Sequence, residues 1–231
     1  MSASLVGSEM CIRDSDYFKG TLPEFPAGKP LFIFASHFHA DHYAPVIFQL
    51  GEKRENVFYI LSKEIGKKIP EEYRKRYKDR MRLVKAGERF CLNISEESLI
   101  VETFHSTDEG VAFWLSCEGK EIYHAGDLNN WWCEGEDMAW NRNMAASYKQ
   151  EMKKLSGRTA DLAFIPVDPR LGQWFYLGAA GFMEQADTKW IFPMHFWEDY
   201  TIIPKLIEHS SSEGWRDRIV EIHKEGEEFI R

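Results

Sequence analysis

The stretch Ser36-His37-Phe38-His39-Ala40-Asp41-His42-Tyr43 decides how the rest of the chain is interpreted. It places three imidazoles and one carboxylate within six residues, directly after an apolar run that predicts a strand. In a protein core each of these side chains would need a partner, because burying an unpaired polar group costs free energy on the order of a few kcal/mol. The same side chains are ordinary ligands of divalent zinc, iron or manganese. The motif therefore predicts a metal site.

Three further ligand-type side chains follow predicted strands downstream of this motif. His105 comes after the apolar segment 99–104, Asp127 closely follows 121–125, and His195 comes after 190–194. A surface histidine cluster, the alternative interpretation of the motif, gives no reason for such residues to recur at strand ends. Because α/β sheets place their ligand sites at the carboxyl ends of strands, we expect these residues to join the motif at one site.

The remaining sequence alternates between β-rich apolar runs and helical patterns, which is typical of an α/β protein. Runs of Ile, Val, Phe, Tyr and Trp predict strands at 31–36, 57–62, 82–85, 99–104, 111–117, 121–125, 162–167, 190–194 and 219–223. Helices are predicted at 44–50, 63–68, 70–79, 140–155, 178–186 and 203–209. Since no internal repeat and no Gly/Ser linker interrupts this pattern, we expect a single α/β domain.

The first fifteen residues do not fit this pattern. Residues 1–15 have no clear period and resemble the peptide obtained when a sequencing-library adaptor is translated; an ordinary flexible terminus is the alternative. We therefore predict that residues 1–15 are a non-native leader and that residues 16–231 form the domain.

Charge and cysteine content limit the partners and the location. With 29 Lys and Arg against 37 Asp and Glu, the net charge of −8 argues against non-specific binding to nucleic acid or to anionic membranes. Residues 52–85 carry 12 basic and 6 acidic side chains, and a solvated helix face explains this excess better than an anion-attracting rim. The four cysteines form no C-x-x-C pair, and no secretory signal or apolar run of about 18 residues is present. We expect reduced thiols and a cytoplasmic location.

The complete ordered set resembles the signature of the metallo-β-lactamase-fold hydrolases, His-x-His-x-Asp-His followed by a lone His, a lone Asp and a lone His. The resemblance covers about residues 16–231 and implies a four-layer αββα sandwich with a dinuclear metal site at one edge of its two sheets. It implies a first metal held by His37, His39 and His105, a second held by Asp41, His42 and His195, and Asp127 as the bridge. Two divalent ions are implied, zinc by default, with manganese or iron as alternatives.

The chemistry implied by the resemblance is hydrolysis by a hydroxide bound to the dinuclear metal site, with catalytic Asp41 orienting the hydroxide or moving its proton. A small-molecule ester, lactone or related compound is the expected substrate, and a phosphodiester is the alternative. The RNA-processing nucleases of the family carry a large inserted domain, for which the chain has no room between Asp127 and His195. We expect no nucleic-acid or membrane partner, and no oligomeric state is predicted.

Three residues near the expected site are candidates for contacting the substrate. Arg170 is suited to a carboxylate or phosphate, although a structural salt bridge explains it nearly as well. Trp131 and Tyr176 come soon after polar segments at strand ends and are candidate walls of a substrate pocket. Helix–sheet packing is the alternative for both aromatic residues.

The N-terminal region supports a different hypothesis. Members of the family begin with a β-hairpin before the strand that leads to the metal motif, and residues 16–30 are too short and too rich in Pro and Gly to form it. We expect the chain to lack this hairpin, which would leave a sheet edge unpaired. The second hypothesis for function is therefore a truncated metal-binding protein without turnover.

Overall fold

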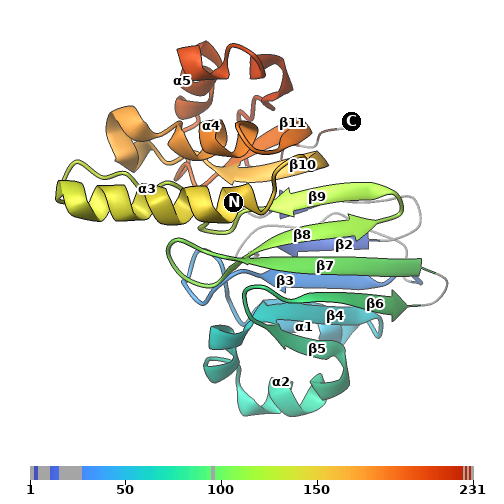
Figure 1. The fold of residues 1–231 in the computed structure, drawn as a ribbon. Coiled ribbons are helices and arrows are strands. Elements are labelled where there is room, and N and C mark those ends of the chain that lie inside the picture. The colour runs from blue at the N-terminus through green and yellow to red at the C-terminus, as the bar shows by residue number, and fades with distance from the viewer. Residues whose placement is uncertain are drawn as a thin grey trace.

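Two β-sheets form the centre of the protein in a computed structural model, which describes residues 3–4, 11–15, 28–94, 97–225, 227 and 229 (Figure 1). The first sheet has the strand order β1 (Ala3–Ser4), β2 (Cys11–Ser15), β3 (Leu31–Ala35), β4 (Val57–Ser62) and β5 (Met81–Val84). The second has the order β11 (Asp187–Met194), β10 (Thr159–Pro166), β9 (Lys120–His124), β8 (Val111–Cys117), β7 (Glu97–His105) and β6 (Arg89–Ile94). Strands β2 to β5 are parallel, β6 to β9 are antiparallel, and β9, β10 and β11 are parallel.

Strand β3 is buried on both faces, as its continuous apolar sequence predicts. Successive side chains of a strand point to opposite faces, so Phe32 and Phe34 belong to one apolar cluster and Leu31, Ile33 and Ala35 to another. The Phe34 ring lies 5.2 Å from that of Phe113 in β8, in an edge-to-face arrangement. The two sheets therefore pack against each other through the first cluster.

Short helices cover the outer face of the first sheet. Helix α1 (Ile47–Lys53) buries Ile47 and Phe48 against Tyr59 of β4. Helix α2 (Glu71–Arg76) adds Tyr73, whose ring stacks on Phe48 at 4.7 Å. The second apolar cluster thus lies between this sheet and its helices.

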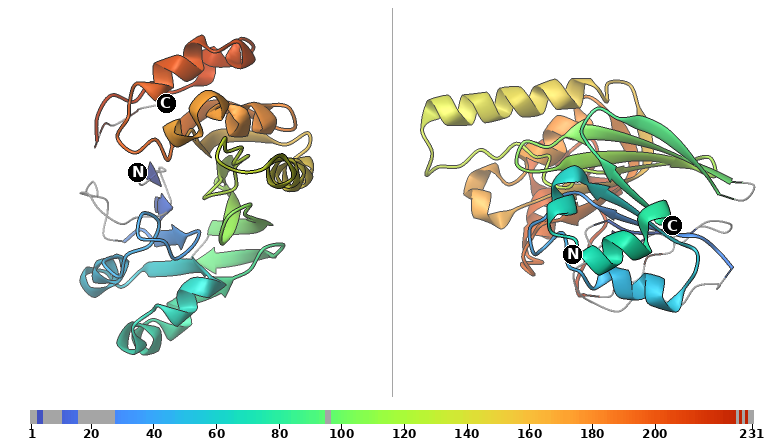
Figure 2. Two further views of the ribbon diagram at one scale, coloured as in Figure 1. Left: turned by 90° about the vertical axis from the view of Figure 1, so that its left-hand side faces the viewer. Right: turned by 90° about the horizontal axis from the view of Figure 1, so that it is seen from below.

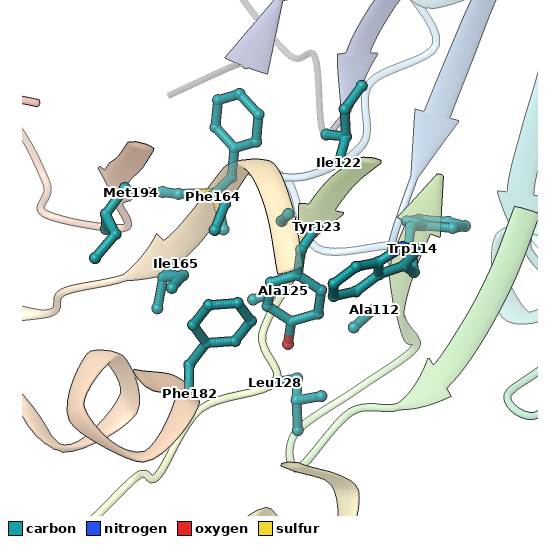
Figure 3. Packing of buried hydrophobic residues seen from close by; sticks show 14 of the residues in the cluster. Ala112, Trp114, Ile122, Tyr123, Ala125, Leu128, Phe164, Ile165, Phe182 and Met194 are labelled. Carbon is teal, nitrogen blue, oxygen red and sulfur yellow. The ribbon is translucent and has the colours of Figure 1, made fainter. Parts of the chain in front are cut away.

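One long helix and one short helix lie along the outer face of the second sheet, on the side of the molecule opposite α1 and α2 (Figure 2). Asp137 is the N-cap of helix α3 (Met138–Lys153), and its carboxylate accepts a hydrogen bond from the Trp140 N–H at 2.8 Å. Helix α4 (Leu177–Met183) places Phe182 on Tyr123 of β9, with ring centroids 4.9 Å apart (Figure 3). Helix α5 (Ile202–Glu208) follows β11. Among the described residues, no helix is both long and apolar enough to cross a bilayer.

Several predicted elements differ from those observed. The predicted strand 219–223 is absent: it meets β11 only in a bridge between Ile219 and Ile191, with the Val220 N–H donating to the Ile191 carbonyl. Segment 63–68 is a 3₁₀ helix, η1 (Lys63–Lys67), closed by an i to i−3 bond from the Lys68 N–H to the Ile65 carbonyl. The predicted helix 70–79 divides into α2 and the 3₁₀ helix η2 (Lys78–Arg80). Strand β6 was not predicted.

Most of the predicted leader, residues 1–15, lies outside the described residues. Its described parts pair with each other as antiparallel β1 and β2, and β2 pairs in parallel with β3. We expected an unpaired sheet edge, and in the structure the edge of β3 is covered by β2. Residues 16–27, where a native hairpin was expected to be missing, are also outside the described part of the chain. The origin of the leader and the loss of the hairpin stay predictions.

Candidate metal centre

The histidine motif folds as a compact turn directly after β3. The N–H groups of His42 and Tyr43 both donate to the His39 carbonyl, at 3.0 and 2.8 Å. Two glycines with positive φ allow neighbouring loops to approach this turn. A Cβ on Gly110 would lie 1.9 Å from the Ser36 carbonyl oxygen, and one on Gly126 would lie 2.7 Å from the Ser36 Cβ. These close approaches fix the motif against the loops that precede β8 and follow β9.

His37, His39 and Asp127 form the first group of ligand atoms. His37 Nε2 lies 3.0 Å from His39 Nδ1 and 3.3 Å from Asp127 Oδ2. The His37 side chain is 0% exposed, and its other ring nitrogen, Nδ1, lies 3.0 Å from the Ser36 hydroxyl oxygen. His39 is only partly buried, so the first group is accessible to solvent on the side where His39 lies.

Asp41, His42 and His195 form the second group. Asp41 Oδ2 lies 3.3 Å from His42 Nε2 and 3.7 Å from His195 Nε2. Burial acts to raise the pKa of the Asp41 carboxyl, but the hydrogen bond and charge of His42, together with the charge of His195, outweigh it and lower the pKa. Asp41 is therefore ionised at neutral pH, as a ligand carboxylate must be.

Asp127 lies between the two groups with one carboxylate oxygen directed to each. Its Oδ2 contacts His37 of the first group, whereas its Oδ1 lies 3.2 Å from His42 Nε2 and 3.5 Å from His195 Nε2. The side chain is 5% exposed and comes from the loop after β9. Imidazole nitrogens and carboxylate oxygens converging at such distances are the donor set of divalent metal ions, so the residues present fit a dinuclear site.

His105, the third ligand expected for the first metal, lies outside both groups. It is the last residue of β7, where it pairs with Val111 of β8, and its side chain is exposed. Its backbone N–H donates to Glu151 Oε2 of α3 at 3.2 Å. The structure thus places His105 as the end of a strand and gives its imidazole no place among the converging ligand atoms.

The three candidate substrate residues have different surroundings. The Trp131 ring lies edge to face on His195 at 5.4 Å, and its Nε1–H donates to the Asp127 carbonyl at 2.9 Å. Arg170 forms a salt bridge to Asp168, which was the alternative interpretation, while keeping a side chain that is 59% exposed. Tyr176 stacks on His209 at 4.0 Å, which agrees with the packing alternative. Trp131 and Arg170 therefore lie beside the second group, and Tyr176 packs elsewhere.

One acidic residue beside His195 was missed by the sequence interpretation. Asp168, after β10, accepts a bond at 2.8 Å from His195 Nδ1 and is contacted by Trp197 Nε1 at 3.3 Å. Burial acts to raise the pKa of Asp168, but the hydrogen bonds from His195 and Arg170 outweigh it and lower the pKa. Trp197 is 51% exposed, and His195, Trp197 and Glu198 all have positive φ values, between 52° and 63°. The run Asp168-Pro169-Arg170 at a strand end was the available signal for this acid.

Comparisons with known proteins give matches at the level of structure. No protein-family model matches the chain, and no curated protein matches its sequence. The short form of human tRNase Z aligns at 15% identity over 84% of this chain and 85% of that one, with a TM-score of 0.40. The metallo-β-lactamase fold protein YhfI from Bacillus subtilis aligns at 10% identity over 71% of this chain and 64% of that one, with a TM-score of 0.40.

A protein of unknown function from Enterococcus faecalis V583 also aligns, at 15% identity and a TM-score of 0.37, over 64% of this chain and 34% of that one. The chain therefore spans about a third of the length of this relative and about two thirds of that of YhfI. It is structurally similar to metallo-β-lactamase-fold proteins. The geometry of the ligand groups, and not these likenesses, supports the function proposed below.

Proposed function

We propose that the protein is a metal-dependent hydrolase of small molecules that uses a dinuclear site. The observation that carries the proposal is the placement of Asp127, whose two carboxylate oxygens face two different groups of imidazole and carboxylate atoms. A buried carboxylate with a structural role needs only one set of hydrogen-bond partners. A carboxylate that bridges two metal ions needs a separate group of ligand atoms facing each of its oxygens. The donors are nitrogen and oxygen atoms without thiolate, so zinc is the default, with manganese or iron as alternatives.

His37, His39 and Asp127 would hold one ion, and Asp41, His42, His195 and Asp127 the other. Bound there, divalent ions supply Lewis acidity and lower the pKa of water toward about 7. The ionised Asp41 carboxylate, with a side chain that is 29% exposed, would accept a hydrogen bond from the attacking water and orient it. Trp131 and Trp197 both lie edge to face on the His195 ring, at 5.4 and 5.2 Å, and would limit the access of bulk water to this position.

The substrate proposal rests on the groups around His195. Arg170 uses Nε and Nη2 to bind Asp168, which leaves Nη1 on a largely exposed side chain directed away from that salt bridge. Its guanidinium lies 4.5 Å from the Trp197 ring centroid. A cation next to an aromatic surface suits a small ester or lactone that carries a carboxylate. We propose in addition a cytoplasmic location and no nucleic-acid or membrane partner.

The test begins with metal analysis of the purified protein, for which we expect about two ions per chain. p-Nitrophenyl esters, lactones and bis-p-nitrophenyl phosphate are then assayed with the wild type and with Asp127→Ala. We expect ester or lactone hydrolysis that Asp127→Ala abolishes and that Asp79→Ala, which removes an exposed carboxylate from η2, leaves unchanged.

Four results would contradict the proposal in different ways. Fewer than one ion per chain would exclude the dinuclear site. Hydrolysis that persists in Asp127→Ala would exclude the bridging role. Turnover of the phosphodiester alone would favour the phosphodiesterase, and two bound ions without any turnover would favour the metal-binding protein.

A further inference from the structure

Asp168 is a buried carboxylate that binds three side chains at the edge of the second group. Its side chain is 1% exposed. Arg170 approaches with Nε at 3.0 Å from both carboxylate oxygens and Nη2 at 2.6 Å from Oδ2, and its backbone N–H is 2.8 Å from Oδ1. His195 Nδ1 and Trp197 Nε1 reach Oδ2 from the other side. All of these groups are donors, so they hold the carboxylate in one orientation.

The backbone fixes this carboxylate relative to His195. Strands β10 and β11 are parallel, with Pro166 paired to Met194, and the Val167 N–H donates to the Met194 carbonyl at 2.8 Å. Asp168 and His195 therefore leave neighbouring strands at the same edge of the sheet. Their contact at 2.8 Å depends on the register of a regular strand pair and not on a surface loop.

The contact determines which nitrogen of His195 is available as a ligand. An imidazole ligates through an unprotonated nitrogen while its other nitrogen carries the proton. Because Asp168 accepts a hydrogen bond at Nδ1, the proton is held there and Nε2 keeps its lone pair. Nε2 is the atom that faces Asp127 Oδ1 at 3.5 Å and Asp41 Oδ2 at 3.7 Å. The carboxylate thus presents the ligating nitrogen to the second group.

A salt bridge alone does not explain the arrangement. Arg170 would satisfy Asp168 equally well if His195 were turned away, yet the shortest contact of the imidazole is with this carboxylate. In the first group, by contrast, His37 Nδ1 contacts the neutral hydroxyl of Ser36 at 3.0 Å. An imidazole is a stronger metal ligand when its second nitrogen contacts an anion than when that nitrogen contacts a neutral hydroxyl.

We propose that Asp168 is the positioning residue of the second metal group, which fixes the tautomer and orientation of His195 and strengthens its binding of a divalent ion. This proposal rests on the proposed function for its metal, but the tautomer is a property of the metal-free chain. Different results can therefore contradict the positioning role of Asp168 and the proposed function.

The experiment compares the wild type, Asp168→Asn, Asp168→Glu and Asp168→Ala. The tautomer of His195 is measured in metal-free protein by the nitrogen chemical shifts of its ring, assigned with His195→Gln. We expect the proton on Nδ1 in the wild type and a mixture of tautomers in Asp168→Asn. Zn²⁺ binding is then measured by calorimetric titration, where Asp168→Asn should weaken the second group by roughly 10- to 100-fold. Asp168→Glu should recover part of that loss.

Asp161→Asn is the matched control. Asp161 lies on the same strand, β10, and its carboxylate binds Lys189 Nζ at 2.6 Å and the Glu121 N–H at 2.9 Å. Its removal should lower thermal stability without changing the His195 tautomer or Zn²⁺ affinity. If Asp168→Ala fails to fold, the Asn and Glu variants carry the test. An unchanged tautomer and unchanged Zn²⁺ affinity in Asp168→Asn would overturn the positioning role, whereas absent Zn²⁺ binding by the wild type would overturn the proposed function.

Discussion

The two ligand groups share the same donor chemistry but are supported differently. The first group has three residues, a partly exposed histidine and a neutral hydroxyl behind His37. The second has three residues of its own, the additional Oδ1 of Asp127, and an anion behind His195. Catalytic zinc sites keep a position open for water, whereas sites with four protein ligands are closed. We therefore predict that the second group binds its ion more tightly and that the first keeps the open position.

The largest expected effect comes from removing the imidazole closest to both acids of the second group. His42 Nε2 lies 3.2 Å from Asp127 Oδ1 and 3.3 Å from Asp41 Oδ2. His42→Ala should reduce the metal content from two ions to one and lower kcat/KM by about 10³-fold, because a metal ion contributes several kcal/mol of transition-state stabilisation. Elemental analysis and ester kinetics measure this. Two ions retained in the variant would show that His42 is not a ligand.

Stepwise removal of metal tests the comparison directly. Dialysis of the wild type against increasing chelator should release one ion first, and the two dissociation constants should differ by about tenfold or more, which corresponds to ~1.4 kcal/mol. In His39→Ala, the release of the more weakly bound ion should disappear from the dialysis experiment, whereas the release of the more tightly bound ion should remain. Simultaneous release of both ions from the wild type would contradict the proposed difference.

Ser36 offers a smaller test on the side of the first group. Its hydroxyl oxygen lies 3.0 Å from His37 Nδ1, and a neutral hydrogen bond contributes about 0.5–1.5 kcal/mol. Ser36→Ala should therefore weaken the first group by roughly 3- to 10-fold, less than Asp168→Asn weakens the second. Calorimetric titration of the two variants side by side measures both. A larger effect at Ser36 than at Asp168 would reverse the comparison.

The smallest effect is expected at His105. Because its imidazole is exposed and lies outside both groups, His105→Ala should keep two ions per chain and change Zn²⁺ affinity by less than about twofold. Loss of one ion in this variant would show that His105 completes the first group, as the resemblance to the family implies.

The local parts of the site could be predicted from the sequence, and the long-range parts only in outline. Placement of His37, His39, Asp41 and His42 in one turn follows from their spacing after a strand. Asp127 and His195 could be predicted from their positions at strand ends. The position of Asp168 at a strand end was visible in the sequence, but its contact with His195 could not be predicted, because it depends on the pairing of Pro166 with Met194 and local pattern does not contain the register between distant strands.

Fold prediction was limited in the same way. Strands β4 and β8 were predicted with their observed bounds because both are continuous apolar runs. Strand β6 (Arg89–Ile94) was missed because polar and apolar residues alternate in a short segment, and its pairing with β7 stabilises it. The role of His105 stays a prediction: its position at a strand end satisfies the spacing of a ligand, but in the structure it pairs with Val111 and lies outside both groups.

The left-handed residues after β11 have a consequence for the stability of the protein. His195, Trp197 and Glu198 adopt positive φ values without being glycine, a conformation that costs each about 1–2 kcal/mol relative to the right-handed form. A change to negative φ at any of the three residues would turn the His195 imidazole or the Trp197 indole beside it. Folding free energy is thus given up at the place where geometry matters most. Efforts to make the protein more heat-resistant are best directed at the helices on the outer faces of the sheets, where a gain in stability leaves this loop unchanged.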